Sequence, residues 1–264
     1  MMREVIFATV KGIFRDRVFR GIAVSALFFL LIPSISTLSM RQVVELSITL
    51  SLSLLSFMML LLSVFLGGSS LWKDTERRYT YSILGLPLTR TSYLLGKFIG
   101  IAGFLLMTSF VLGGVSCVVV KYVSILYPPA RAIVWTNVIF SIFFIALKYI
   151  LLVACAFLLS TVSTSFFLPI FGALGFFLAG SASQQVYDYL RSASAKSYSP
   201  LIKDVVSGLY YVLPNFSAFD LSVNAIYGID LPLSGLMLTI GYFTIYTAII
   251  LTLSAIVFSR REIQ

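Results

Sequence analysis

The chain contains six long apolar runs separated by more polar connections. A helix needs about 20 predominantly apolar residues to cross the hydrocarbon core of a bilayer. Six segments approach or exceed that length, at about residues 21–38, 46–66, 93–120, 133–159, 166–182 and 233–258. The pattern therefore predicts an all-α polytopic membrane protein, in which residues 1–264 form a single transmembrane domain.

The amino-terminal segment, residues 1–20, has an amphipathic pattern. Apolar side chains share one helical face, and basic side chains lie largely elsewhere. The apolar set is Met2, Ile6, Val10 and Ile13, and the basic set is Lys11, Arg15, Arg17 and Arg20. This pattern predicts an interfacial helix lying on the membrane. A cleavable signal peptide is the competing interpretation, but the charges extend too far and no small-x-small site ends the next apolar run.

A second polar segment, residues 183–232, separates the fifth and sixth apolar runs. Within it an amphipathic stretch from Leu201 to Leu213 ends at Pro214 and is too short to span a bilayer. We expect an outer re-entrant or interfacial helical segment here.

A connection dense in charged residues lies between apolar runs at residues 71–92. Gly67, Gly68, Ser69 and Ser70 precede it and predict a loosened chain before the loop. Within the loop, Tyr79, Ile83 and Leu86 recur at helical spacing before Pro87, which predicts a short amphipathic helix outside the bilayer. The alternative is a solvated loop whose basic residues only follow topology rules.

Composition excludes a soluble domain. Hydrophobic residues make up 59% of the chain and charged residues 11%, while the mean hydropathy is +1.01. The net charge of +9 could indicate nucleic-acid binding, but the basic residues stand at the ends of apolar runs and form no single face. We therefore expect a lipid bilayer as the surroundings and no nucleic-acid partner.

The distribution of basic residues predicts the orientation. One side receives most of them: Arg3, Lys11, Arg15, Arg17, Arg20, Lys73, Arg77, Arg78, Arg90, Lys97, Arg260 and Arg261. The other side receives Arg41, Lys121, Arg131, Arg191, Lys196 and Lys203. The positive-inside rule then places both termini and the 71–92 loop in the cytoplasm.

Several kinds of chemistry are excluded by what the sequence lacks. It contains no histidine, so Ser-His-Asp triads and histidine metal sites are ruled out, and we expect no catalytic, cofactor or metal site. Gly96-Lys97 is followed by Phe98 and lacks the earlier glycine of a nucleotide-binding loop. Cys117 and Cys155 lie inside apolar runs, which favours packing over a disulfide.

Lys148 lies well inside the fourth apolar run. A charge at that depth costs on the order of 3 kcal/mol to insert, which makes Lys148 a candidate for the translocation pathway. It either faces a polar partner or the interior of a dimer, or it extends its ammonium towards the cytoplasm.

The charged connection also resembles the first cytosolic loop of type-2 ATP-binding-cassette (ABC) exporter permeases. The matching residues are Glu76, Leu84, Leu86, Pro87, Thr89, Arg90, Gly96 and Lys97. The chain departs from the pattern at Tyr79-Thr80, where the family usually has Gly-Thr. The resemblance extends to the order of segments along the chain, and it implies that the outer segment is a re-entrant gate.

The resemblance implies a permease subunit of an exporter in the cytoplasmic membrane of a prokaryote. Its loop would be a coupling helix that docks on a separate cytosolic ATPase, which would bind the ATP. The implied coupling residues are Glu76, Arg77, Arg78, Ile83, Leu84, Leu86, Pro87 and Arg90. Six spans are half the usual complement, which implies a second permease copy, as a homodimer or a paired permease.

Two other classes stay open. A secondary transporter would use an intramembrane ionisable residue, for which Lys148 is the candidate. A membrane-embedded enzyme would need convergent polar groups, yet the outer carboxylates of Asp188, Asp204, Asp220 and Asp230 have no recognisable spacing. The sequence leaves the transported substrate open.

Overall fold

The computed structural model describes the chain except for residues 1, 40–41, 77–88, 130, 192–198 and 261–264. All regular elements among the described residues are helices. In chain order they are α1 (Met2–Arg15), α2 (Arg17–Ser25), η1 (Ala26–Leu31), α3 (Ile32–Ser36), α4 (Val43–Glu76), α6 (Arg90–Leu126), α7 (Trp135–Val162), α8 (Phe167–Arg191), α9 (Pro200–Val212), η3 (Phe216–Phe219), α10 (Ser222–Tyr227) and α11 (Leu233–Arg260).

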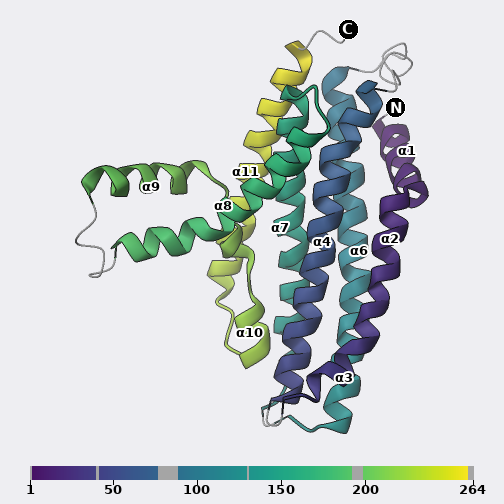
Figure 1. The fold of residues 1–264 in the computed structure, drawn as a ribbon, viewed down its shortest axis with the longest axis vertical. Helices are drawn as coiled ribbons and strands as arrows, with labels where there is room; N and C mark the ends of the chain where they lie inside the picture. Colours follow the sequence, from purple (N-terminus) through teal and green to yellow (C-terminus); the bar gives the residue numbers. More distant parts are fainter. Residues whose placement is uncertain (1, 40–41, 77–88, 130, 192–198, 261–264) are drawn as a thin grey trace.

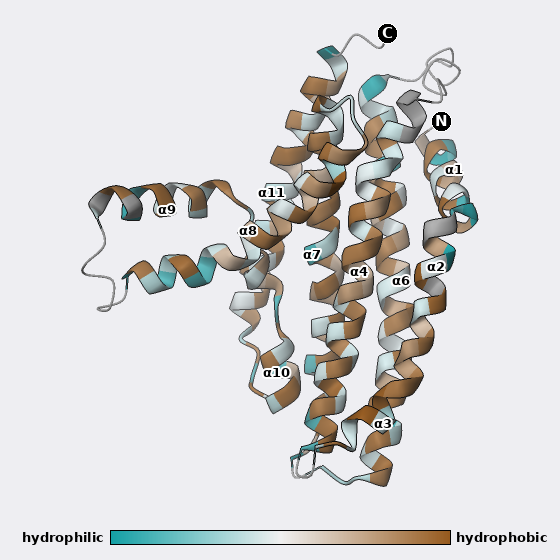
Figure 2. Cartoon of the chain, in the orientation of Figure 1, coloured by the Kyte–Doolittle hydropathy of each residue, from teal (hydrophilic) through white to brown (hydrophobic). Residues whose placement is uncertain are grey.

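The predicted all-α fold is confirmed among the described residues, together with its six long apolar helical segments. Within the described part of the chain, six helical segments are long and apolar enough to cross a membrane. They are Phe19–Ser36, Val43–Trp72, Arg90–Leu126, Trp135–Val162, Phe167–Arg191 and Leu233–Arg260. Apolar residues dominate along these helices in Figure 2, and many large apolar side chains are exposed on them. A bilayer explains that exposure, because lipid tails solvate apolar side chains.

Helices α4 and α8 continue well past the ends that the apolar pattern predicts. The second span was expected to end at Leu66, but α4 continues to Glu76; the fifth was expected to end at Ala182, but α8 continues to Arg191. Gly67 and Gly68 therefore do not loosen the chain. A Cβ atom on Gly67 would lie 3.0 Å from Ala156 Cβ, and one on Gly68 would lie 2.8 Å from Ile170. These glycines let α7 and α8 approach α4 closely.

Helix α7 is the centre of the bundle. Its span is 83% buried, whereas the spans of α8 and α11 are 17% and 22% buried. The long helices α4, α6, α8 and α11 surround it (Figure 1). The buried polar residues of α7, such as Asn137 and Ser141, are consequently held inside protein and not presented to lipid.

The amphipathic amino-terminal helix packs along α6 with its apolar face. A Cβ atom on Gly96 would lie 3.2 Å from Val5, and one on Gly100 would lie 3.0 Å from Thr9. The pair therefore admits α1 close to α6, and Phe14 continues the contact by meeting Phe104 edge to face. The basic side chains of α1 stay exposed.

The first span is built from three short pieces, α2, η1 and α3. A 3₁₀ segment of six residues, Ala26–Leu31, interrupts it, and Pro33 lies in the first turn of α3. Its exposed apolar side chains include Val24, Leu27 and Phe28. This span therefore lies at the edge of the bundle, as Figure 1 also shows.

The segment between the fifth and sixth spans forms two parts. The distal half of α8 and α9 make a hairpin that projects sideways from the bundle (Figure 1), held by stacked Tyr187 and Tyr210 rings 4.2 Å apart. The second part, η3 and α10, packs back against α7. Phe216 and Phe219 of η3 are fully buried, so this part is a component of the core.

Candidate functional site

Most of the predicted coupling residues lie outside the described residues. These are Arg77, Arg78, Ile83, Leu84, Leu86 and Pro87. The structure does describe the two helix ends that bracket them. Helix α4 ends at Glu76 and α6 begins at Arg90, at the same end of the bundle as both chain termini (Figure 1).

Side chains connect the helices that meet at this end. The buried Lys97 of α6 donates from Nζ to the carbonyl of Ser70 on α4 over 2.6 Å. Arg90 donates to the carbonyl of Ser259 on α11 over 3.4 Å. Tyr93 stacks on Phe258 with ring centres 6.4 Å apart. Contacts thus join the end of α4, the start of α6 and the end of α11 beside the 71–92 loop.

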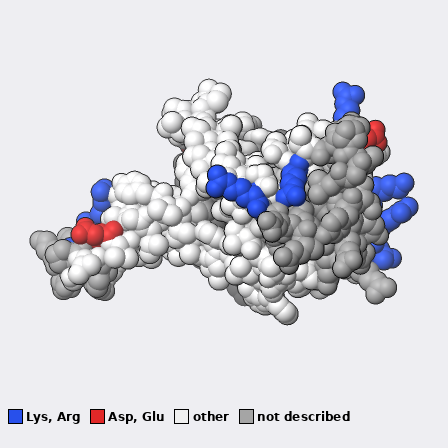
Figure 3. Space-filling model, turned by 90° about the horizontal axis from the view of Figure 1, so that it is seen from above, with Lys and Arg blue, Asp and Glu red and all other residues white. Residues whose placement is uncertain are grey.

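The same end of the molecule carries exposed basic side chains. Figure 3 views this end and shows Lys and Arg side chains around it. Arg3, Lys11, Arg15 and Arg20 of the first two helices are exposed, and Arg260 closes α11. Among the described residues, one end of the bundle therefore carries these five basic residues of the set that the positive-inside rule assigns to one side.

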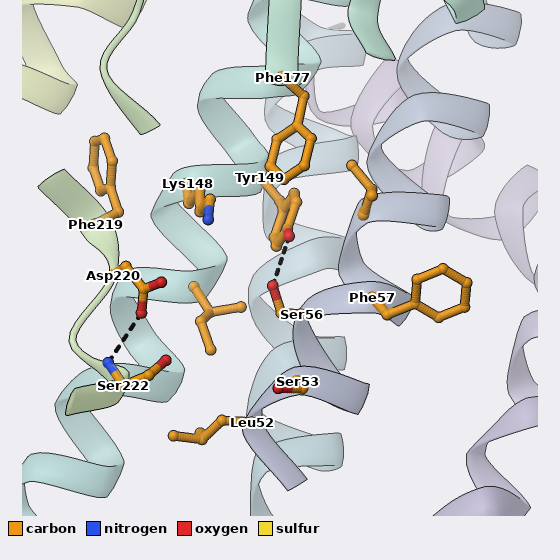
Figure 4. A pocket seen from close by; sticks show the side chains of 12 residues that line it. Leu52, Ser53, Ser56, Phe57, Lys148, Tyr149, Phe177, Phe219, Asp220 and Ser222 are labelled. Atoms are coloured by element: carbon orange, nitrogen blue, oxygen red, sulfur yellow. Dashed lines mark hydrogen bonds between the residues drawn. The ribbon is translucent and has the colours of Figure 1, made fainter. Parts of the chain in front are cut away.

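Lys148 lies near the middle of α7 and faces a cavity of about 280 Å³. Four parts of the fold line this cavity: α4, α7, α8 and the chain around η3 and α10. The lining residues are Leu52, Ser53, Ser56, Phe57, Leu60, Ile145, Lys148, Tyr149, Phe177, Phe219, Asp220 and Ser222. Figure 4 shows the ammonium of Lys148 and the carboxylate of Asp220 directed towards the same space.

Aromatic rings and one carboxylate surround the Lys148 ammonium. Nζ lies 5.2 Å from the ring centre of Phe177 and 5.8 Å from that of Tyr149, distances at which a ring face attracts a cation. The Asp220 carboxylate lines the same cavity. Among the described residues, however, no ion pair joins the two side chains within 4.0 Å. The charges share the cavity without direct contact.

Hydrogen bonds hold the other polar groups of the cavity in place. Ser56 on α4 and Tyr149 on α7 share a hydrogen bond of 2.6 Å between their hydroxyls. The Asp220 carboxylate accepts from the Ser222 N–H over 3.0 Å. These bonds restrain Ser56, Tyr149 and Asp220, and the cavity combines one cation, one anion and four aromatic rings.

Polar residues on α7 anchor the segment that carries Asp220. Buried Asn137 donates from Nδ2 to the carbonyls of Asn224 and Ile229, over 3.0 and 2.8 Å. Ser141 donates to the carbonyl of Leu221 over 3.1 Å. These bonds satisfy backbone groups that would otherwise be buried without partners. They place Asp220 beside the middle of α7.

The sequence indicated part of this cavity and missed the rest. Lys148 stood out as a charge in an apolar run. Asp220 did not, because nothing in its local pattern distinguishes it from the other outer carboxylates. In the sequence pattern, Phe177 and Tyr149 are ordinary apolar positions of their predicted spans. Only helix packing brings these four residues together.

Comparison with known proteins adds no family. No protein-family model matches the chain, and no curated protein is significantly similar to it in sequence.

Proposed function

We propose that this chain is the membrane-spanning permease subunit of an ATP-binding-cassette transporter. The subunit pairs with a second permease copy, forms the translocation pathway and is driven by a separate cytosolic ATPase. Direction is export, and the location is the cytoplasmic membrane of a prokaryote, with both termini and residues 71–92 on the cytoplasmic side. ATP binds to the partner and not to this chain.

One observation carries the proposal: the helix ends beside the 71–92 loop are tied to one another. Lys97 joins α6 to α4, and Arg90 joins α6 to α11. A displacement of the loop by a partner would therefore move three spans together. An ordinary solvated connection has no need of such ties, whereas a loop that transmits force from an ATPase does.

The lengths of the two flanking helices agree with this role. Helix α4 has 34 residues and α6 has 37, about 51 and 56 Å at 1.5 Å per residue. The hydrocarbon core is about 30 Å thick. Both helices are long enough to extend beyond the bilayer and carry a docking element to a soluble partner.

The Lys148 cavity supports a secondary transporter as the second candidate. An intramembrane cation beside Asp220 is the kind of charge arrangement that ion-coupled transporters use. Such a transporter would work without ATP, so the experiment below separates the two classes.

The test is ATP hydrolysis by the purified complex. Tagged permease is isolated from the membranes of its own cells, and vanadate-sensitive ATP hydrolysis in the product is measured. Ile83→Asp and Leu84→Asp place charge on the apolar face of the loop and should remove the activity. Burial of such side chains contributes about 25 cal/mol per Å², several kcal/mol in total.

Arg78→Ala is the matched control in the same loop. A charge at the rim contributes roughly 1 kcal/mol or less, so most of the ATP hydrolysis should be retained. Full retention in both aspartate variants would show that this segment is not the coupling element. Absence of ATP hydrolysis from the unmodified complex, together with transport driven by an ion gradient, would favour the secondary transporter.

A further inference from the structure

The Lys148 cavity is open at one side. Ser53, Phe57 and Asp220 are the exposed members of its lining, and the Phe57 side chain is 56% exposed. Ser53 and Phe57 lie in the middle of the apolar span Val43–Trp72 of α4. An opening at this position lies at the depth of the lipid tails and not at an aqueous end of the bundle.

The charges of the cavity are unusual for that depth. Lys148 and Asp220 come from different parts of the fold, and each is restrained separately by rings or a backbone N–H. Among the described residues they do not close into an ion pair. Two opposite charges held apart inside a membrane protein leave room for a ligand that pairs with both.

A ligand with a single charge would fit this arrangement poorly. An anion would pair with Lys148 but would face the Asp220 carboxylate, and a cation would face the Lys148 ammonium. A zwitterion satisfies both, since its anionic group reaches Lys148 while its ammonium reaches Asp220.

The volume sets the size of the ligand. About 280 Å³ lies below the usual range for whole drug-sized ligands, roughly 300–1,000 Å³, and so suits a head group better than a complete lipid. Phe57 and Leu60 line the cavity together with the exposed Ser53. An acyl chain can leave past these apolar side chains into the bilayer while the head group stays inside.

We propose that this cavity binds an amphiphile whose head group carries an ammonium and a phosphate. The phosphate contacts Lys148, the ammonium contacts Asp220, and the acyl chains lie outside along α4. The proposed binding site depends only on the geometry of the cavity. A role of the amphiphile as the transported cargo depends in addition on the proposed permease function.

The test compares lipids with equal acyl chains on the purified full-length chain in detergent. Phosphatidylethanolamine carries both charges of the proposed head group, and phosphatidylglycerol carries the phosphate without the ammonium. Native mass spectrometry over a lipid titration measures the apparent Kd for each. We expect phosphatidylethanolamine to bind about tenfold more tightly, as one charge-assisted hydrogen bond would produce. Equal binding of the two lipids by the unmodified chain would overturn the proposal, even if no variant folds.

Charge-removing variants make the test specific. Asp220→Asn leaves one cation and should reverse the preference towards phosphatidylglycerol. Lys148→Met should weaken phosphatidylethanolamine binding about tenfold. Asp230→Asn and Lys121→Met remove charges that are exposed and do not line the cavity, and both should bind as the unmodified chain does. Unchanged lipid preference in folded Asp220→Asn would contradict the assignment.

Free O-phosphoethanolamine identifies the source of the head group. It should bind much more weakly than the lipid, because it lacks the acyl chains; equal affinity would overturn the amphiphile part of the proposal. The measurement needs no ATPase. A lipid preference without any ATP hydrolysis by the complex would refute the proposed permease function and leave the lipid site standing. ATP hydrolysis without a lipid preference would refute the lipid site and leave the permease function standing.

Discussion

Replacement of Gly180 by alanine tests the packing that positions Asp220. Gly180 lies in α8 against the segment that leads into η3. A Cβ atom at this position would overlap the carbonyl oxygen of Pro214 and would lie 2.8 Å from Cδ2 of the Phe216 ring. Phe216 is fully buried, so its ring has no free space into which to turn. We expect Gly180→Ala to push η3 away from α8.

The magnitude follows from the distances. The Pro214 carbonyl must move about 1 Å to reach ordinary contact with the new methyl group. Overpacking of this kind typically costs about 1–3 kcal/mol. Alanine also favours a helix over glycine by up to about 1 kcal/mol, which opposes the loss.

Gly175→Ala on the same helix cancels that second contribution. A Cβ atom on Gly175 meets nothing within 4 Å. Both variants gain the same helix propensity, so their difference in unfolding free energy isolates the clash. We expect Gly180→Ala to be less stable than Gly175→Ala by about 1–3 kcal/mol.

The assay is unfolding in mixed micelles by titration with sodium dodecyl sulfate, followed by far-ultraviolet circular dichroism. Binding of phosphatidylethanolamine gives a second measurement, because a displaced η3 carries Asp220 away from Lys148. Gly180→Ala should bind the lipid more weakly, whereas Gly175→Ala should not change it. Equal unfolding curves for the two variants would refute the close contact between α8 and the Pro214 segment.

Two further predictions concern the ends and the edge of the bundle. In a background without native cysteines, an impermeant thiol reagent added to intact cells should label Pro128→Cys and not Thr75→Cys; the opposite result would invert the topology. Gly100→Leu should displace the amino-terminal helix from α6 and expose residues 1–15 to protease, because a Cβ at Gly100 already lies 3.0 Å from Thr9. Gly103→Leu meets open space and should leave cleavage unchanged; equal protection in both variants would rule out this docking.

The sequence by itself determined the class of the molecule and the approximate position of its spans. Apolar runs of bilayer length predict helices here, because every backbone N–H and C=O group in lipid needs a hydrogen-bond partner within the protein. The spacing of Gly96 and Gly100 is visible in the sequence as a small-residue pattern that permits close helix packing. The helix that packs there is not visible, because small residues indicate that a helix packs closely without indicating against which helix.

Helix ends and the cavity depended on the tertiary structure. Gly67, Gly68 and the polar residues after Ala182 read as breaks in the local pattern, yet neighbouring helices pack against both regions and keep them helical. Lys148 was visible as a charge in an apolar run, but its surroundings come from segments far away in the chain. Hydropathy is a local property of the sequence, whereas the meeting of Lys148 with Asp220 depends on how η3 and α10 fold back onto α7. That placement was decided by the buried bonds of Asn137 and Ser141 and by the close contact at Gly180.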